Sequence, residues 1–226
     1  MARRMIFPLL FGILGVAILV SLGNWQMRRL AWKEALLAEI ESRLSAPPVA
    51  LPAAPDPDKD RYLAVTLRGR IEPPALFVLT SREGEGPGFR VISPLVTEGG
   101  RRVLLDRGFV PERARARVAE ARGPLEVEGN LDWPRETDSY TPEPDRARGI
   151  WFARDVPRMA AELGTEPVLV VARRIDPPDA VVTPAPVDTA SIRNPHLGYA
   201  IQWYGMALVW AGMTLYWLWR IRRRGG

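Results

Sequence analysis

Two long segments without a charged residue, one near each end of the chain, restrict the fold more than any other feature. The first is Met5–Leu22 and the second is Leu197–Trp219. As helices they would extend about 27 and about 35 Å at 1.5 Å per residue, which suits the hydrocarbon core of a bilayer. We therefore predict two transmembrane helices, over residues 5–23 and 196–219.

Each segment also has an alternative interpretation. The first could be a cleaved signal peptide, because Ser21-Leu22-Gly23 imitates a small-x-small cleavage site. Its apolar run is longer than a usual signal core and a second candidate span follows, which favours retention. The second segment could be a buried core helix, but its length, its Trp and Tyr content and its terminal arginines favour a membrane span.

The charges that flank these segments indicate an orientation. Six arginines lie on the terminal sides, namely Arg3, Arg4, Arg220, Arg222, Arg223 and Arg224. The opposing charges on the inner sides are Arg28, Arg29, Lys33 and Arg193. The bias predicts a multi-pass protein of a bacterial inner membrane, with both termini cytoplasmic and the central region periplasmic. Because most of the net charge of +5 belongs to the membrane flanks, it is no argument for nucleic-acid binding.

Proline-rich segments divide the central region. Proline at high density stops helices and favours extended, semi-rigid backbone, so residues 45–61 and 176–195 are predicted to be linkers. Before the first linker, residues 24–44 are predicted to extend the first helix. An apolar stripe at three- and four-residue steps marks this extension: Trp25, Trp32, Leu36, Leu37, Ile40 and Leu44. A folded domain over residues 62–175 remains.

This domain is predicted to be rich in β-structure. Tyr62–Gly69 alternates apolar and polar residues, and further short apolar runs are separated by glycine-containing turns. One short helix is expected, capped by Asp155 and stopped by Gly164. The short spacing of the strands favours an antiparallel barrel or sandwich over a parallel sheet. The predicted class is an α+β membrane protein, with two transmembrane helices flanking a β-rich extramembrane domain.

Composition excludes most catalytic chemistry. The chain has no cysteine, so disulfides, thiolate metal sites and cysteine nucleophiles are excluded. Its one histidine, His196, adjoins a predicted membrane helix and is far in sequence from candidate serines, so no Ser-His-Asp set can be argued. We therefore expect a protein that is not an enzyme.

The outer end of the predicted helices gathers unusual residues. Asn194 and Pro195 are expected to start the second helix. The candidate site residues are His196, Tyr199 and Trp203 from the second helix, with Trp25, Arg28 and Arg29 from the first. Imidazole ligates iron, aromatic rings flank a porphyrin and guanidinium groups pair with propionates, so the set suits a haem. The same residues also fit interfacial anchors and a hydrogen-bonding histidine at a helix end, and spacing alone favours that interpretation over a haem site.

Five segments follow one another in an order that is informative. They are Gly23-Asn-Trp-Gln-Met-Arg-Arg-Leu-Ala-Trp-Lys, then Val65–Arg70 with Gly86–Leu95, Val103–Pro111, Trp151–Val156 and Asn194–Leu208. The first is similar to a G-x-W-Q-x-x-R-x-x-W-K signature and the last to an N-x-H-x-x-Y-A-x-T-W-Y motif. Together they resemble the surfeit locus protein one family, the Surf/Shy-type cytochrome c oxidase assembly factors, over almost the whole chain.

The resemblance implies an assembly factor for haem-A-containing cytochrome c oxidase, which binds haem A and assists its insertion into the catalytic subunit. It carries the iron ligand over to His196. The implied partners are that subunit, haem-A synthase and membrane lipid. The alternative is a membrane-tethered scaffold that docks on the oxidase or haem-A synthase and holds no haem. This sequence departs from the family pattern at four positions, namely Asp106, Phe109, Phe152 and Gln202. We interpret the Val103–Pro111 segment as turn and core of a hairpin, in preference to a partner contact.

Overall fold

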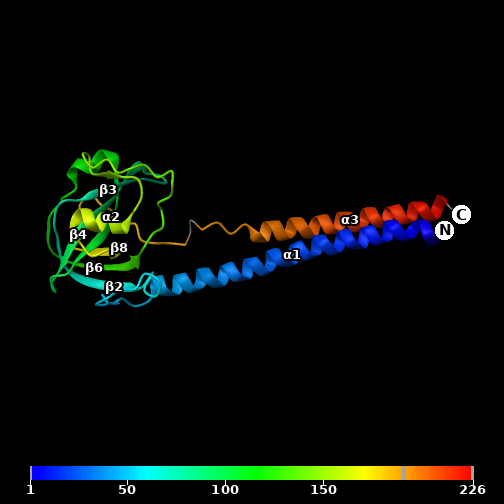
Figure 1. Ribbon diagram of the computed structural model, residues 1–226, viewed down its shortest axis with the longest axis horizontal. Coiled ribbons are helices and arrows are strands. Elements are labelled where there is room, and N and C mark those ends of the chain that lie inside the picture. The colour runs from blue at the N-terminus through cyan, green and yellow to red at the C-terminus, as the bar shows by residue number, and fades with distance from the viewer. Residues whose placement is uncertain (1, 190–191, 225–226) are drawn as a thin grey trace. The chain divides into compact units, whose positions relative to one another are not determined.

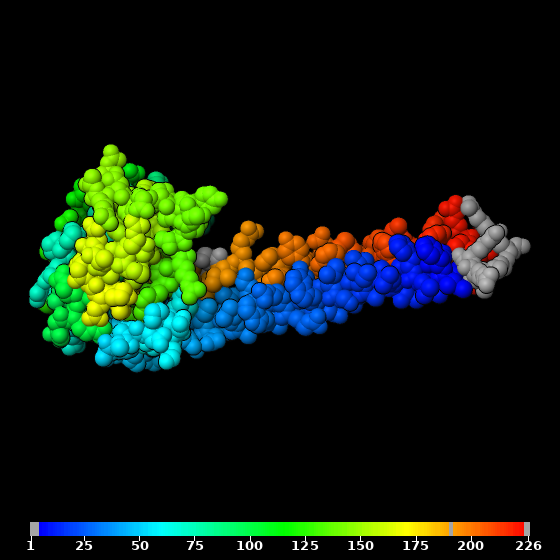
Figure 2. All heavy atoms as spheres, viewed as in Figure 1, coloured from blue at the N-terminus to red at the C-terminus, as the bar shows by residue number. Residues whose placement is uncertain are grey.

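The computed structural model describes residues 2–189 and 192–224 and divides the chain into two compact units. A helical unit contains the described parts of residues 1–39 and 189–226, and a β unit contains Ile40–Asp188. The helical unit pairs most of α1 (Ala2–Ser45) with α3 (His196–Arg224), and the two helices run antiparallel, side by side (Figures 1 and 2).

Small residues determine how closely the two helices approach. A Cβ atom added to Gly12 would lie 2.1 Å from the Thr214 side chain, and one on Gly15 would lie 2.2 Å from the ring of Trp210. One on Gly23 would lie 2.6 Å from another aromatic ring, that of Tyr204. Glycine at these positions lets side chains of α3 rest directly on the backbone of α1, as in helix pairs of membrane proteins.

The inward face of α1 differs from the predicted apolar stripe. Trp25 and Trp32 are 51% and 52% exposed, whereas Gln26 is buried and Lys33 is partly buried. The stripe was therefore wrong for these tryptophans. Buried and half-buried positions recur on α1 at steps of three and four residues, and the close-approach glycines share that face. Glycines and polar residues thus share the contact face, so hydrophobicity alone does not identify it.

Among the described residues, α1 is the one helix both long and apolar enough to cross a membrane, with a mean hydropathy of 2.6 over its most apolar segment. The helix α3 has 29 residues. Its tryptophans, tyrosines, glycines and Gln202 lower its mean hydropathy, so a second span is not established by this criterion.

The β unit contains one large mixed sheet and two short helical segments. Its strands are β1 (Val49–Ala50), β2 (Ala64–Ile71), β3 (Leu76–Arg82), β4 (Gly86–Thr97), β5 (Arg102–Pro111), β6 (Arg122–Asp132), β7 (Ile150–Trp151) and β8 (Leu169–Asp176). A 3₁₀ helix, Glu112–Arg117, follows β5, and α2 (Val156–Leu163) precedes β8. The strand order is β1-β2-β6-β8-β5-β4-β3-β7. Strand β2 also pairs with β4, so the pairings β2–β6–β8–β5–β4 return to β2.

The expected all-antiparallel arrangement is wrong in part. The pairs β1–β2, β3–β7 and β5–β8 are parallel. Strand β8 lies between β6 and β5 in the sheet. It pairs antiparallel with β6 and parallel with β5. The fold is therefore a mixed α/β structure with a large sheet and an N-terminal apolar helix.

The helix α2 was predicted correctly, including both of its ends. The carboxylate of Asp155 accepts a hydrogen bond from the backbone N–H of Arg158 at 3.2 Å, and Gly164 ends the helix in the left-handed conformation with φ 62°. Its apolar face includes Met159, which is fully buried, and packs against the β unit's core beside Trp151.

The predicted linkers belong largely to the folded unit. Strand β1 pairs with β2, and the guanidinium of Arg101 donates a hydrogen bond to the carbonyl oxygen of Pro52 at 2.7 Å. On the other side, residues 177–187, here the C-terminal strap, lie against the sheet, and Val182 is buried. An extended proline-rich backbone offers free carbonyl acceptors, and arginines of the sheet donate to them. The β unit accordingly reaches from Ile40 to Asp188 rather than from 62 to 175.

Strand β5 holds the C-terminal strap. Arg107 is fully buried and forms an ion pair with Asp179 of the strap, while its guanidinium also donates to the carbonyl oxygen of Ala119 at 2.8 Å. Phe109 and Thr183 exchange two backbone hydrogen bonds of 2.8 and 2.9 Å. Gly108, at φ 120°, has no room for a side chain, because a Cβ atom would lie 2.1 Å from the carbonyl oxygen of Thr183. The interpretation of Val103–Pro111 as hairpin core is confirmed, but the predicted turn is not part of it, because the whole segment belongs to β5.

Asp179→Asn is expected to destabilise the β unit by about 3–5 kcal/mol, because it leaves the Arg107 guanidinium buried without a counter-charge. Burial alone would raise the pKa of Asp179, but the hydrogen bond and charge of Arg107 outweigh it and lower that pKa. The contribution is therefore present above about pH 4 and is lost as the pH falls through the lowered pKa. Chemical denaturation at several pH values measures both effects.

Glu128→Gln is the matched control, because Glu128 pairs with Arg174 on the exposed surface and should contribute little. An Asp179→Asn variant no less stable than this control would show that the buried pair does not hold the strap.

Candidate functional site

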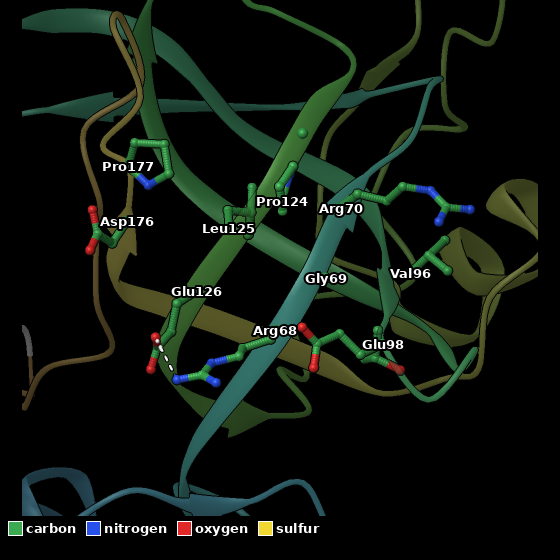
Figure 3. A pocket seen from close by; sticks show the side chains of 12 residues that line it. Arg68, Gly69, Arg70, Val96, Glu98, Pro124, Leu125, Glu126, Asp176 and Pro177 are labelled. Atoms are coloured by element: carbon green, nitrogen blue, oxygen red, sulfur yellow. Dashed lines mark hydrogen bonds and ion pairs between the residues drawn. The ribbon is translucent and has the colours of Figure 1, made fainter.

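A charged pocket with a volume of about 570 Å³ lies on the sheet of the β unit (Figure 3). Arg68 reaches across it to Glu126, at 3.3 Å, while Arg70 extends the other way and pairs with Glu72. Gly69 lies between them, close to the backbone of β4. Ion pairs engage Arg68, Arg70 and Glu126, and no histidine, cysteine or serine of the described chain lines this pocket. We therefore place the candidate site in the helical unit, which contains the one histidine of the chain.

The sole histidine of the chain has a specific partner there. His196 is the first residue of α3, and its Nδ1 atom lies 2.7 Å from Oε1 of Gln26 on α1. An amide oxygen only accepts hydrogen bonds, so this contact requires the proton on Nδ1, and in the neutral ring Nε2 then keeps its lone pair. Metal-ligating histidines usually have this arrangement, in which one ring nitrogen donates a hydrogen bond and the other faces the metal.

Two further polar contacts join the helices near His196. The hydroxyl of Tyr204 donates to Oδ1 of Asn24 at 2.7 Å, and the ammonium group of Lys33 donates to the backbone carbonyl of Arg193. These contacts flank the Gln26 position on both sides along α1. They fix the start of α3 against α1, and thereby the position of the imidazole.

The expected side-chain cap of α3 is absent. The Oδ1 atom of Asn194 is buried and has no hydrogen-bond partner within the described part of the chain, so Asn194 does not cap the helix. A buried acceptor without a donor costs free energy, and it lies two residues before His196. An additional donor could satisfy it at this site.

The other predicted site residues divide between two faces. Trp203 is partly buried with His196 between the helices. Trp25 and Tyr199 are 51% and 49% exposed, and the guanidinium of Arg29 lies 4.0 Å from the ring centre of Trp32. These three residues project outward, so they surround the outer end of the helix pair rather than contacting the imidazole.

Arg28 and Arg29 lie on different faces of α1. Trp25 and Arg29 lie seven and eleven residues after Ile18, spacings that return to the same helix face, whereas Arg28 is rotated by about 100° from Arg29. Arg28 is exposed. Arg29, beside Trp25, is therefore the better placed of the two to meet an anionic group near His196.

Sequence reasoning missed Gln26 as a site residue. Gln26 belongs to the W-Q signature, but the predicted apolar stripe includes its neighbour Trp25 instead. Its burial, at 8% exposure, and its pairing with His196 identify it in the structure. The sequence feature that could have identified Gln26 is its amide side chain, which lies at three- and four-residue spacing from the other inward positions of an apolar helix.

The chemistry open to this site is limited. Within the part of the chain that the structure describes, no group of three or more His, Asp or Glu residues is placed to hold a metal ion. A single imidazole can still hold a haem iron, because the macrocycle supplies four nitrogen ligands itself.

The chain matches the model of the SURF1 family over residues 13–208, a range that contains both Gln26 and His196. The chain belongs to the SURF1 family. It is 33% identical to surfeit locus protein 1 of Homo sapiens over 211 residues, covering 82% of this chain and 69% of the human protein. It is 28% identical to a SURF1-like protein of Rickettsia bellii over 198 residues, covering 84% and 81% of the two chains. The resemblance inferred from the five motifs is thus confirmed.

The tautomer of His196 is directly testable. Because the chain has one histidine, the imidazole ¹⁵N resonances need no assignment. At a pH where the ring is neutral, we expect the Nδ1–H form to dominate, because Gln26 only accepts at that position. Gln26→Leu should shift the population toward the Nε2–H form.

Gln202→Leu, an amide-to-apolar change six residues further along α3, is the control and should leave the tautomer unchanged. A wild-type spectrum dominated by the Nε2–H form would contradict the proposed hydrogen bond.

Proposed function

We propose that this protein is a membrane-bound assembly factor for haem-A-containing cytochrome c oxidase. In this proposal it holds haem A beside the start of α3, where His196 meets Gln26 of α1, and assists its insertion into the catalytic subunit. The observation that carries the proposal is the His196–Gln26 hydrogen bond, which leaves Nε2 of the only histidine free to ligate iron. Membership of the SURF1 family supports the role in oxidase assembly.

The residues present fit such a group. Bound haem would supply an iron with an open axial position, and His196 is the one strong neutral nitrogen donor of the chain. Trp25 and Tyr199 offer exposed aromatic faces beside it. Arg29 is placed to pair with a propionate, and Arg28 offers a second guanidinium to the adjoining face. The unpartnered Oδ1 of Asn194 is an acceptor for a further donor.

The proposed location is the bacterial inner membrane, with α1 and α3 both spanning it. The high mean hydropathy of α1 supports the first span. The glycine contacts between α1 and α3 support the second, because a helix packed along a spanning helix shares its depth. The arginines at both ends of the chain favour cytoplasmic termini and a periplasmic β unit.

The β unit completes the proposal as a non-enzymatic, partner-binding module. We infer that the returning circuit of pairings through β2, β6, β8, β5 and β4 closes a small barrel. The buried ionic groups of β5 are occupied in holding the C-terminal strap, which supports a structural role for them. The oxidase catalytic subunit and haem-A synthase are the proposed partners.

Replacing the imidazole tests the haem site. Purified His196→Ala protein, co-expressed with haem-A synthase, should lose or strongly shift the Soret absorbance of the wild type, because no other strong neutral nitrogen ligand exists. The protein yield should change little, since a half-buried residue at a helix end contributes little packing.

His196→Gln sharpens the test, because its amide can still donate to Gln26 while it ligates iron poorly. It should lose the Soret band as well. A normal haem spectrum in both variants would favour the alternative of a membrane-tethered scaffold that docks on the oxidase or haem-A synthase without holding haem.

Membrane orientation is tested with a reporter that is active only in the periplasm. Fused after Gly226 it should be silent, and inserted near Pro55 it should be active, because the terminal arginines favour the cytoplasm. The converse pattern, or activity at both positions, would refute the proposed two-span topology.

A further inference from the structure

An apolar groove of about 680 Å³ runs along one side of the helix pair. The wall from α1 includes Gly15 and Ile18, and the wall from α3 includes Gln202, Gly205, Met206 and Met213. Gly205 leaves its part of the wall open, since a Cβ atom added there would have no neighbour within 4 Å. The groove is almost wholly apolar, and Gln202 is the polar group at its upper end.

The groove continues the face that carries the outer candidate site residues. Trp25 lies seven residues after Ile18 on α1, and Tyr199 lies seven residues before Met206 on α3, so each shares its helix face with a groove residue. Gln202 is six residues beyond His196, or about 9 Å further along the helix axis. From Gln202 to Met213 the groove extends about 16 Å in the same direction.

We propose that this groove receives the isoprenoid tail of haem A, with the amide of Gln202 hydrogen-bonded to the hydroxyl group at the root of the tail. This inference rests on the proposed function and names the part of the ligand that the site would distinguish. The extended length of a farnesyl chain is comparable to that of the groove. The hydroxyl is the one polar group of the tail, and Gln202 is the matching polar group of the groove.

Such a groove would chiefly set the orientation of the bound haem and would add little to its affinity. Lipid solvates an isoprenoid chain as well as apolar side chains do, so burial from lipid gains little by the hydrophobic effect. Shape fit and the Gln202 hydrogen bond remain as the sources of preference, and interhelical polar contacts in membranes have modest strength. A tail held on this side would fix the rotation of the ring about the bond from iron to His196.

Comparing haem O with haem B measures the contribution of the tail to binding, because haem O carries the hydroxyethylfarnesyl group where haem B carries a vinyl group. Titrating both into the full chain in lipid nanodiscs, followed at the Soret band, should show a preference for haem O of roughly three- to tenfold. Gly205→Leu fills the groove without a clash inside the protein and should reduce the preference to about one, chiefly by weakening haem O. Gln202→Leu should reduce it in part.

Gly212→Leu is the matched control. Gly212 lies seven residues after Gly205 and is equally open, but it is not part of the groove wall, so the preference should persist. Equal binding of both haems to the wild type, or an equal loss of both in Gly205→Leu, would overturn the groove inference while leaving His196 as ligand. Failure of the wild type to bind either haem would instead refute the proposed function itself.

Discussion

The glycine contacts between α1 and α3 determine where the histidine of this protein lies. Gly12, Gly15 and Gly23 each accept a larger side chain of α3 against the backbone, and together they fix the antiparallel register of the pair. That register brings His196 opposite Gln26, a residue 170 positions earlier in the chain. A side chain in place of any one glycine would separate the helices and remove the partner that sets the imidazole tautomer.

In the β unit, charged side chains hold distant segments of the chain in position. Its incoming and outgoing segments are held by guanidinium groups that donate to backbone carbonyls: Arg173 to Leu44 at 2.6 Å, and Arg90 to Ala185 at 2.6 Å. Arg90 is fixed in turn by the buried carboxylate of Asp106. Buried ion pairs repay their desolvation only with good geometry, and they are a weak source of net stability. Their consequence here is a defined path of the chain into and out of the sheet.

Local patterns predicted the elements whose signals are local. The caps of α2, Asp155 and Gly164, could be read directly because a cap acts within one helical turn. Fully buried Arg107 could not be anticipated, because its counter-charge, Asp179, is 72 residues away in a segment that proline content marked as a linker. Gln26 was missed for the same reason: which face of α1 turns inward depends on α3, and hydrophobicity alone does not report it.

The partner of His196 also bears on what the proposed site is suited to do. Metal-ligating histidines are often hydrogen-bonded to a carboxylate, which raises the basicity of the ring and strengthens ligation. Here the partner is a neutral amide, which orients the ring without placing a negative charge beside it. The ring is only partly buried, so exchange with a competing ligand is not blocked by packing. A well-oriented donor in an accessible position suits a protein that gives up its ligand to another, and it would serve a permanent redox centre less well.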